Sequence, residues 1–204
     1  AVKSYTNFLK KNMLVLTEDE IKKTVDELNY RYGILLYNKE EYFESITPLK
    51  NYIINNPNDF DILEILGDIF IKEYRYSEAI DTYTRLLDEF PNNEIYYFYI
   101  AQAYLALENY QQAKYYFSKI LVFNEENTDV LFILGKISNI LEEYNEAEKY
   151  LIESTYCGYK TKDLLFQLGL AFGGQKKYLQ SLEAFKEAKT YSNDDPILNY
   201  QIGV

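Results

Sequence analysis

The side chains that most often perform catalysis are scarce in this sequence. It contains no histidine, which removes the commonest general base and the commonest zinc ligand. Cys157 is the only cysteine, so neither an internal disulfide nor a paired-cysteine metal or redox motif can form. Without a histidine to activate its thiol, we expect Cys157 to be a small buried apolar residue and not a nucleophile.

Carboxylates are abundant, but no pair is singled out by its spacing. Glu40 with Glu41, and Glu142 with Glu143, occur beside predicted turns, where exposed charge is ordinary. The sequence also lacks a phosphate-binding loop, a dinucleotide-binding glycine motif, a serine hydrolase motif and a calcium-binding loop. We therefore expect no enzymatic activity, no cofactor and no bound metal. An enzyme that uses carboxylates alone is the least favoured hypothesis.

Tyrosine recurs through the chain at a fixed spacing of 34 residues, at Tyr42, Tyr76, Tyr110, Tyr144 and Tyr178. When the units are aligned on these tyrosines, the eighth position is always small: Gly33, Gly67, Ala101, Gly135 and Gly169. The twenty-fourth position is always large: Leu49, Tyr83, Phe117, Leu151 and Phe185. Small residues that face large ones allow two helices to approach closely. We therefore expect the repeated tyrosine to pack between helices and not to bind a ligand.

This pattern resembles the tetratricopeptide repeat, a helix-turn-helix unit of 34 residues with Leu-Gly, Tyr, Ala, Phe and Pro at fixed positions. The stretch LGDIFIKEYRYSEAIDTYTRLLDEFPNN, residues 66–93, matches best. The resemblance implies an all-α fold, a right-handed α-solenoid of such repeats. It covers residues 26–193, as units 26–59, 60–93, 94–127, 128–161 and 162–195, and residues 196–204 begin a truncated sixth unit.

Residues 1–25 are predicted to form an additional N-terminal helix and the lead-in to the first repeat. Apolar residues with a spacing of three or four indicate a separate helix over residues 1–16, which either caps the solenoid or docks elsewhere on it. Thr17 followed by Glu20 is typical of a capping box at a helix start. The first helix of repeat one is therefore expected to extend back to about Glu18.

One side of each first helix in this family lines a concave groove, and we assign this side to the second, fifth, ninth and twelfth positions of the repeat. The fifth position is aromatic in five of six units. We expect these rings to point away from the core and to form a partner-binding surface; the alternative is that they only tighten the stacking of repeats. The predicted groove residues are Tyr30, Ile34, Tyr37, Glu64, Asp68, Ile71, Phe98, Gln102, Leu105, Phe132, Lys136, Phe166, Leu170 and Tyr200.

The charge of the chain restricts the class of partner. A formal net charge of −11 and a pI near 4.6 argue against nucleic acid and against an anionic membrane surface. No segment approaches the run of about 18 apolar residues that a membrane span requires. The acidic edge at Glu27, Asp61, Glu64 and Asp68 suits a protein segment with apolar anchors and some basic residues.

One subgroup of the family holds acidic C-terminal tails through a lysine and asparagine clamp. Here Tyr30, Ile34, Ile95 and Tyr99 occupy the clamp positions, so this mode is disfavoured. The leading hypothesis is a non-enzymatic adaptor or scaffold that holds a segment of another protein in the groove. The alternatives are a self-association module that forms a homo-oligomer, or a structural part of a larger envelope-tethered assembly. Because the chain begins at Ala1 and not at methionine, a tethered, extracytoplasmic protein is favoured slightly over a cytoplasmic one.

Overall fold

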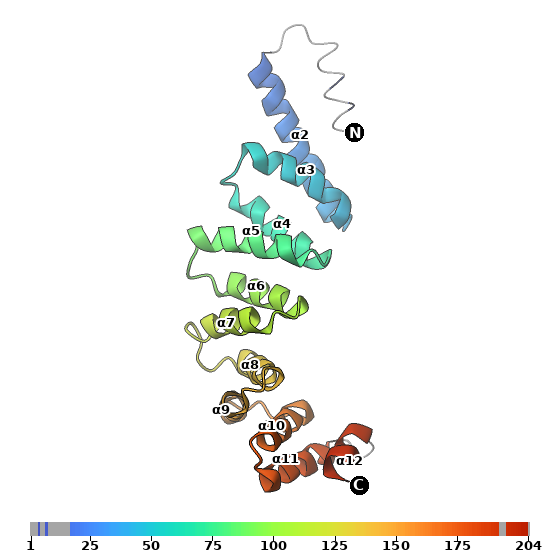
Figure 1. Cartoon of the computed structure of the whole chain (residues 1–204). Helices are drawn as coiled ribbons and strands as arrows, with labels where there is room; N and C mark the ends of the chain where they lie inside the picture. Colours follow the sequence, from blue (N-terminus) through green and yellow to red (C-terminus); the bar gives the residue numbers. More distant parts are fainter. Residues whose placement is uncertain (1–3, 5–6, 8–16, 192–194, 204) are drawn as a thin grey trace. The chain divides into compact units, whose positions relative to one another are not determined.

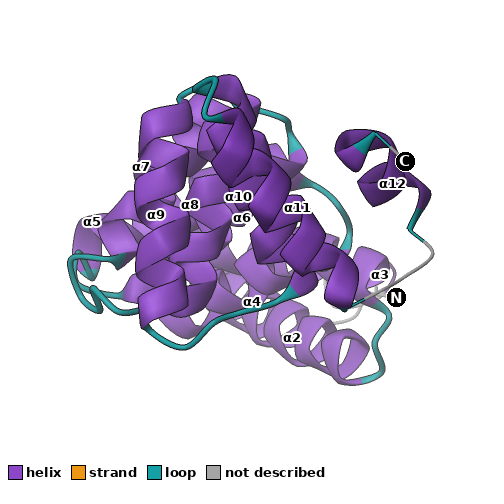
Figure 2. Ribbon diagram, turned by 90° about the horizontal axis from the view of Figure 1, so that it is seen from below, coloured by secondary structure: helices purple, strands orange, loops and turns teal. Residues whose placement is uncertain are grey.

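The computed structural model describes residues 4, 7, 17–191 and 195–203. These residues form helices and no strand (Figure 2), which confirms the all-α prediction. The helix predicted over residues 1–16 lies outside the described residues, apart from Ser4 and Asn7. Among the helices described, none has both the length and the apolar character needed to cross a membrane.

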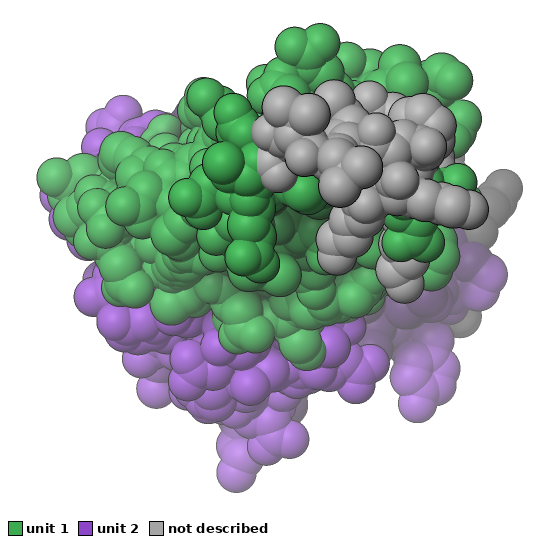
Figure 3. Space-filling view, turned by 90° about the horizontal axis from the view of Figure 1, so that it is seen from above, with its two compact units in different colours: residues 1–99 green, residues 100–204 purple. Residues whose placement is uncertain are grey.

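The chain divides into two compact units, residues 1–99 and residues 100–204 (Figure 3). Unit 1 contains α2 (Glu18–Asn38), α3 (Tyr42–Asn55), α4 (Phe60–Lys72) and α5 (Tyr76–Glu89), and α6 (Glu94–Ala106) begins in it. Unit 2 contains the end of α6 and then α7 (Tyr110–Ile120), α8 (Thr128–Ile140), α9 (Tyr144–Tyr156), α10 (Lys162–Gly174), α11 (Tyr178–Thr190) and α12 (Pro196–Ile202). Consecutive helices pack as pairs, α2 with α3 and α4 with α5 in unit 1, and α8 with α9 and α10 with α11 in unit 2 (Figure 1).

Most first helices begin at a side chain that caps their free backbone N–H groups. Thr17 forms a reciprocal capping box with Glu20 at the start of α2, which confirms the predicted beginning at Glu18. Asp59 accepts a hydrogen bond from the backbone of Ile62 in α4, and Asn127 and Thr161 cap α8 and α10 in the same way. Short polar residues immediately before these four helices therefore set where each helix starts.

The turn between the two helices of each repeat has the same backbone conformation every time. The residue at the fifteenth position has a left-handed backbone conformation in all five repeats, with φ between 57° and 63°. These residues are Glu40, Tyr74, Glu108, Glu142 and Lys176. Only glycine adopts this region without a steric penalty, which is about 1 to 2 kcal/mol for other residues. Each repeat therefore retains a local strain that its helix pair must offset.

Replacing Glu142 by glycine should raise the free energy of unfolding by about 0.5 to 1 kcal/mol, because relief of the strained φ exceeds the added entropy of the unfolded chain. Urea denaturation followed by circular dichroism measures the change. The matched control is Glu183→Gly in the middle of α11, which should instead lower stability by about 0.5 to 1 kcal/mol. A loss of stability in both variants would contradict the assigned turn strain.

The predicted contact of small with large residues is confirmed between the helices of a pair. A Cβ atom added at Gly33 would lie 2.5 Å from the Leu49 side chain, and one at Gly135 would lie 2.5 Å from Leu151. At Gly169 the added atom would lie 2.4 Å from the Phe185 ring. Such distances leave no room for a side chain, so glycine at the eighth position fixes how closely the two helices approach.

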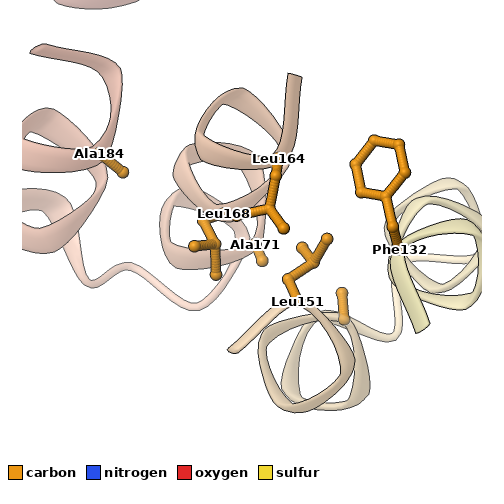
Figure 4. Close-up of a cluster of buried hydrophobic side chains, with 7 residues drawn as sticks. Phe132, Leu151, Leu164, Leu168, Ala171 and Ala184 are labelled. Atoms are coloured by element: carbon orange, nitrogen blue, oxygen red, sulfur yellow. The ribbon is translucent and has the colours of Figure 1, made fainter. Parts of the chain in front are cut away.

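The core also contains a face of the first helix that the sequence analysis did not assign. The third and tenth positions are buried, at Ile62 and Ile69 in unit 1 and at Leu164 and Ala171 in unit 2. In unit 2 the last two belong to a cluster with Leu151 of α9 (Figure 4). Because α9 and α10 belong to successive repeats, this face joins one repeat to the preceding one.

The expectation that Cys157 is buried is wrong. It is exposed and stands immediately after α9, where it caps the helix end through its backbone N–H. The next residue, Gly158, has φ 93°, so the chain turns away from the helix direction there.

Candidate functional site: two pockets on the first-helix face

Unit 1 contains a cavity of about 310 Å³ between its first helices. We call it the tyrosine pocket, because Tyr37, Tyr83, Tyr96 and Tyr99 line it together with Glu64 and Asp68. Its remaining lining residues are Ile65, Asn93 and Ile95. The pocket thus combines aromatic walls with two carboxylates.

Hydrogen bonds from tyrosine hydroxyl groups hold both carboxylates in place. The Tyr37 hydroxyl donates to Asp68 Oδ2 at 3.1 Å, and the Tyr96 hydroxyl donates to Glu64 Oε1. Burial and the bond to Glu64 raise the pKa of Tyr96 to about 12. Burial and the neighbouring Asp68 also raise the pKa of Tyr37. Both shifts mean that a further negative charge is unfavourable in this pocket.

Unit 2 contains a cavity of about 490 Å³ on the corresponding side of its first helices. We call it the amide pocket, after Asn139, Gln167 and Gln201 in its wall; Leu170 and Gly173 also line it. The remaining lining residues are Ile140, Tyr144, Gly169, Gly174, Ser181 and Phe185. A Cβ atom at Gly173 would meet only the Ser181 hydroxyl, at 3.4 Å, so glycine here leaves open space.

The amide of Asn139 is oriented by its neighbour. Its Nδ2 donates to the backbone oxygen of Gln167 at 2.9 Å and to Gln167 Oε1 at 3.0 Å. Its Oδ1 is buried and has no hydrogen-bond partner within the described part of the chain. Because an unsatisfied buried acceptor is unfavourable, this oxygen is suited to accept a donor from outside.

The structure brings some of the predicted groove residues together and separates others. Tyr37, Glu64 and Asp68 meet in the tyrosine pocket, and Leu170 lies in the amide pocket. Tyr30 instead packs against Tyr52, with ring centroids 5.2 Å apart. The other predicted residues line neither pocket: Ile34, Ile71, Phe98, Gln102, Leu105, Phe132, Lys136, Phe166 and Tyr200.

The expectation that the fifth-position rings point away from the core is wrong for Phe132. Only 9% of this residue is exposed, and it belongs to the buried cluster with Leu151 and Leu164 (Figure 4). Lys136 covers the ring, with its Nζ 5.3 Å from the ring centroid. Phe166 is half-buried and packs on Phe185, with ring centroids 5.5 Å apart. At Phe132 and Phe166 the rings therefore contribute to packing.

The sixth position of the repeat was not among the predicted groove positions, and Tyr99 was named only as a clamp position. Tyr99 lines the tyrosine pocket, and Gln167 and Gln201 line the amide pocket, all from this position. At about 100° per residue, the sixth position lies about 160° from the buried eighth position, whereas the fifth lies only about 60° from it. Glutamine recurs at this position in two consecutive repeats, at Gln167 and Gln201, and this recurrence could have indicated a surface outside the core.

Two larger hollows lie near loops and not on the first-helix face. One of about 590 Å³ is lined by Asn56, Pro57 and Asn58 of the loop before α4. The other, of about 560 Å³, is lined by Glu142, Glu143 and Glu146, and Lys114 already forms ion pairs with the last two. No group of three or more His, Cys, Asp or Glu side chains that could hold a metal ion occurs among the residues described.

Two family models match parts of this chain. A family model described as tetratricopeptide repeat matches residues 30–94, and one described as anaphase-promoting complex, cyclosome, subunit 3 matches residues 72–154. The chain belongs to the tetratricopeptide repeat family. Among curated proteins, none matches the sequence significantly.

Solved structures of other tetratricopeptide repeat proteins share the fold. YrrB, described as having an unusual peptide-binding site, aligns at a TM-score of 0.74 and 16% identity over 100% of both chains. A tetratricopeptide repeat protein from Parabacteroides merdae aligns at 0.71 and 19% identity, over 87% of this chain and 70% of that one. MamA aligns at 0.70 and 17% identity, over 81% and 90%. At these identities the likeness shows the fold alone.

Proposed function

We propose that this tetratricopeptide repeat protein is a non-enzymatic scaffold that holds segments of partner proteins on its first-helix face. Tetratricopeptide repeats generally mediate protein–protein interactions. The observation that carries the proposal is that each unit has a pocket on this face, of about 310 Å³ in unit 1 and about 490 Å³ in unit 2. A peptide-binding site described for YrrB, which has the same fold, is consistent with this proposal.

The residues of the two pockets suit an extended polypeptide. In the amide pocket, the unpaired Oδ1 of Asn139 can accept a backbone N–H, and Gln167 and Gln201 supply further donors and acceptors. In the tyrosine pocket, Ile95 offers apolar contact at the rim because this residue is 55% exposed. The proposed binding residues therefore include Tyr37, Glu64 and Asp68 in the pocket of unit 1 and Leu170 in the pocket of unit 2. The buried Phe132 is not among them.

Selection from a random peptide library, followed by calorimetric titration of the selected peptides, tests this function. We expect peptides that bind the pockets to lose at least about tenfold in affinity when Ile95→Lys or Gln201→Lys places a long charged side chain in their pocket, since this corresponds to about 1.4 kcal/mol. Both residues are exposed, so helix content should not change.

The matched controls are Thr84→Lys on α5 and Gln180→Lys on α11, which add the same charge at exposed positions outside the pockets. Binding should be unaffected in these controls. Selected peptides whose affinity is insensitive to both pocket variants would show that the first-helix face is not the binding surface.

Self-association is the second candidate function, and the exposed side of α12 favours it. Ile197 is 61% exposed and Tyr200 is 81% exposed. An apolar surface of this kind can pair with a second copy of the chain. Light scattering over a range of protein concentrations separates the two candidates, because only self-association increases the mass with concentration.

A further inference from the structure

The tyrosine pocket has a more specific chemistry than peptide binding alone, and this inference rests on the proposed function. Its walls are aromatic rings that lie close to one another. The Tyr83 and Tyr99 rings are stacked, with centroids 4.9 Å apart and planes 16° apart, and the Tyr96 ring lies 5.8 Å from Tyr83. Faces of such rings carry partial negative charge, and they attract cations.

Two carboxylates lie on the same side of α4, four residues apart, so both belong to one wall of the pocket. Asp68 pairs with Lys72 at 3.6 Å, whereas Glu64 forms no ion pair among the described residues. Each carboxylate accepts one tyrosine hydroxyl, which leaves further lone pairs available on both. The pocket therefore has a net negative charge that no described lysine or arginine neutralises fully.

We propose that the tyrosine pocket binds the guanidinium group of an arginine side chain from the partner segment. A guanidinium is planar, so it stacks on an aromatic face while its N–H groups donate to carboxylates beside the ring. Glu64 and Asp68 are placed to accept these donors, and Tyr99 offers the ring. An ammonium group from lysine is more strongly hydrated and cannot stack in this way, so lysine should bind more weakly. An apolar side chain would leave the charge of Glu64 without a counter-ion.

Three short blocked peptides test the proposal: acetyl-Gly-Arg-Gly-amide, its lysine analogue and its citrulline analogue. Citrulline keeps the planar shape of arginine but carries no charge. In titrations followed by nitrogen–proton correlation spectra, the arginine peptide should shift resonances of α4 and of residues 94–99 in α6. The citrulline peptide should bind at least about tenfold more weakly, and added salt should weaken arginine binding.

The variant Glu64→Gln with Asp68→Asn should reduce the affinity for the arginine peptide by about tenfold or more. The charge-matched control is Glu44→Gln with Asp81→Asn, which removes two exposed carboxylates of unit 1 outside the pocket. It should bind arginine as the unaltered protein does. Circular dichroism of both variants shows whether the helices remain intact.

Three results would overturn this inference: no shift with the arginine peptide, equal binding of citrulline, or unchanged affinity in the Glu64→Gln, Asp68→Asn variant. These outcomes differ from failure of the proposed function. If library peptides without arginine bind the protein and lose affinity in the Ile95→Lys variant, the scaffold function stands and only the arginine specificity is wrong.

Discussion

Replacing Gly169 by alanine should lower the free energy of unfolding by about 1 to 3 kcal/mol, although alanine is the better helix former. The reason is steric, because the new Cβ would lie 2.4 Å from the Phe185 ring, and that ring is buried in the core. The ring packs in a buried cluster with Leu165 and Leu198, so any movement that makes room for the new atom disturbs that packing. Urea denaturation followed by circular dichroism measures the effect.

Gly173, four residues later on the same helix, is the matched control. An added Cβ there would make only an ordinary contact, at 3.4 Å from the Ser181 hydroxyl. Gly173→Ala should therefore raise the free energy of unfolding by up to about 1 kcal/mol through helix propensity. In a Phe185→Ala background, the cost of Gly169→Ala should disappear. A persistent cost in that background would mean that the ring is not its cause.

The second large effect is expected at Tyr144, where replacement by alanine should cost about 2 to 4 kcal/mol, somewhat less than a fully buried aromatic residue would. The ring lies against the backbone of α10, since a Cβ atom at Gly174 would be only 2.5 Å from it. Gln175 adds a hydrogen bond from its Nε2 to the Tyr144 backbone oxygen at 3.0 Å. Tyr144 therefore joins the fourth repeat to the fifth.

Tyr178 occupies the same position of the next repeat but is 68% exposed, so Tyr178→Ala should cost less than about 1 kcal/mol. The two variants remove identical atoms, and each therefore serves as the control for the other. Thermal melting and urea denaturation of both give the comparison. Equal losses would mean that the repeated tyrosine acts within its own repeat and not on the following one.

The fold could be predicted because its determinants recur. Gly135 facing Leu151 has the same physical meaning as Gly169 facing Phe185, and the repetition separates a packing requirement from coincidence. The start of α2 was predictable for a different reason, since Thr17 and Glu20 act locally. Both kinds of information depend on nearby residues, and they do not require knowledge of how successive repeats meet.

The pockets were predicted less well because they depend on contacts between repeats. Phe132 was expected on the open face, yet the fifth position lies only about 60° from the buried eighth position, and the ring turns into the core. Gln167, on the opposite side of the helix, was not considered. Glu64 and Asp68 were predicted as an acidic edge, but the tyrosine hydroxyl groups that hold them come from neighbouring helices.

The shared left-handed turn residue bears on how a chain of this kind can change its length. Since Glu40, Tyr74, Glu108, Glu142 and Lys176 all have nearly the same φ, each helix pair is built in one way regardless of its neighbours. Duplication or loss of a whole 34-residue unit preserves every such hairpin, whereas an insertion of any other length within a turn disrupts one. In evolution or in engineering, such an array is therefore expected to grow and shrink in whole repeats, and each added repeat would bring another stretch of first-helix surface on which new specificity could develop.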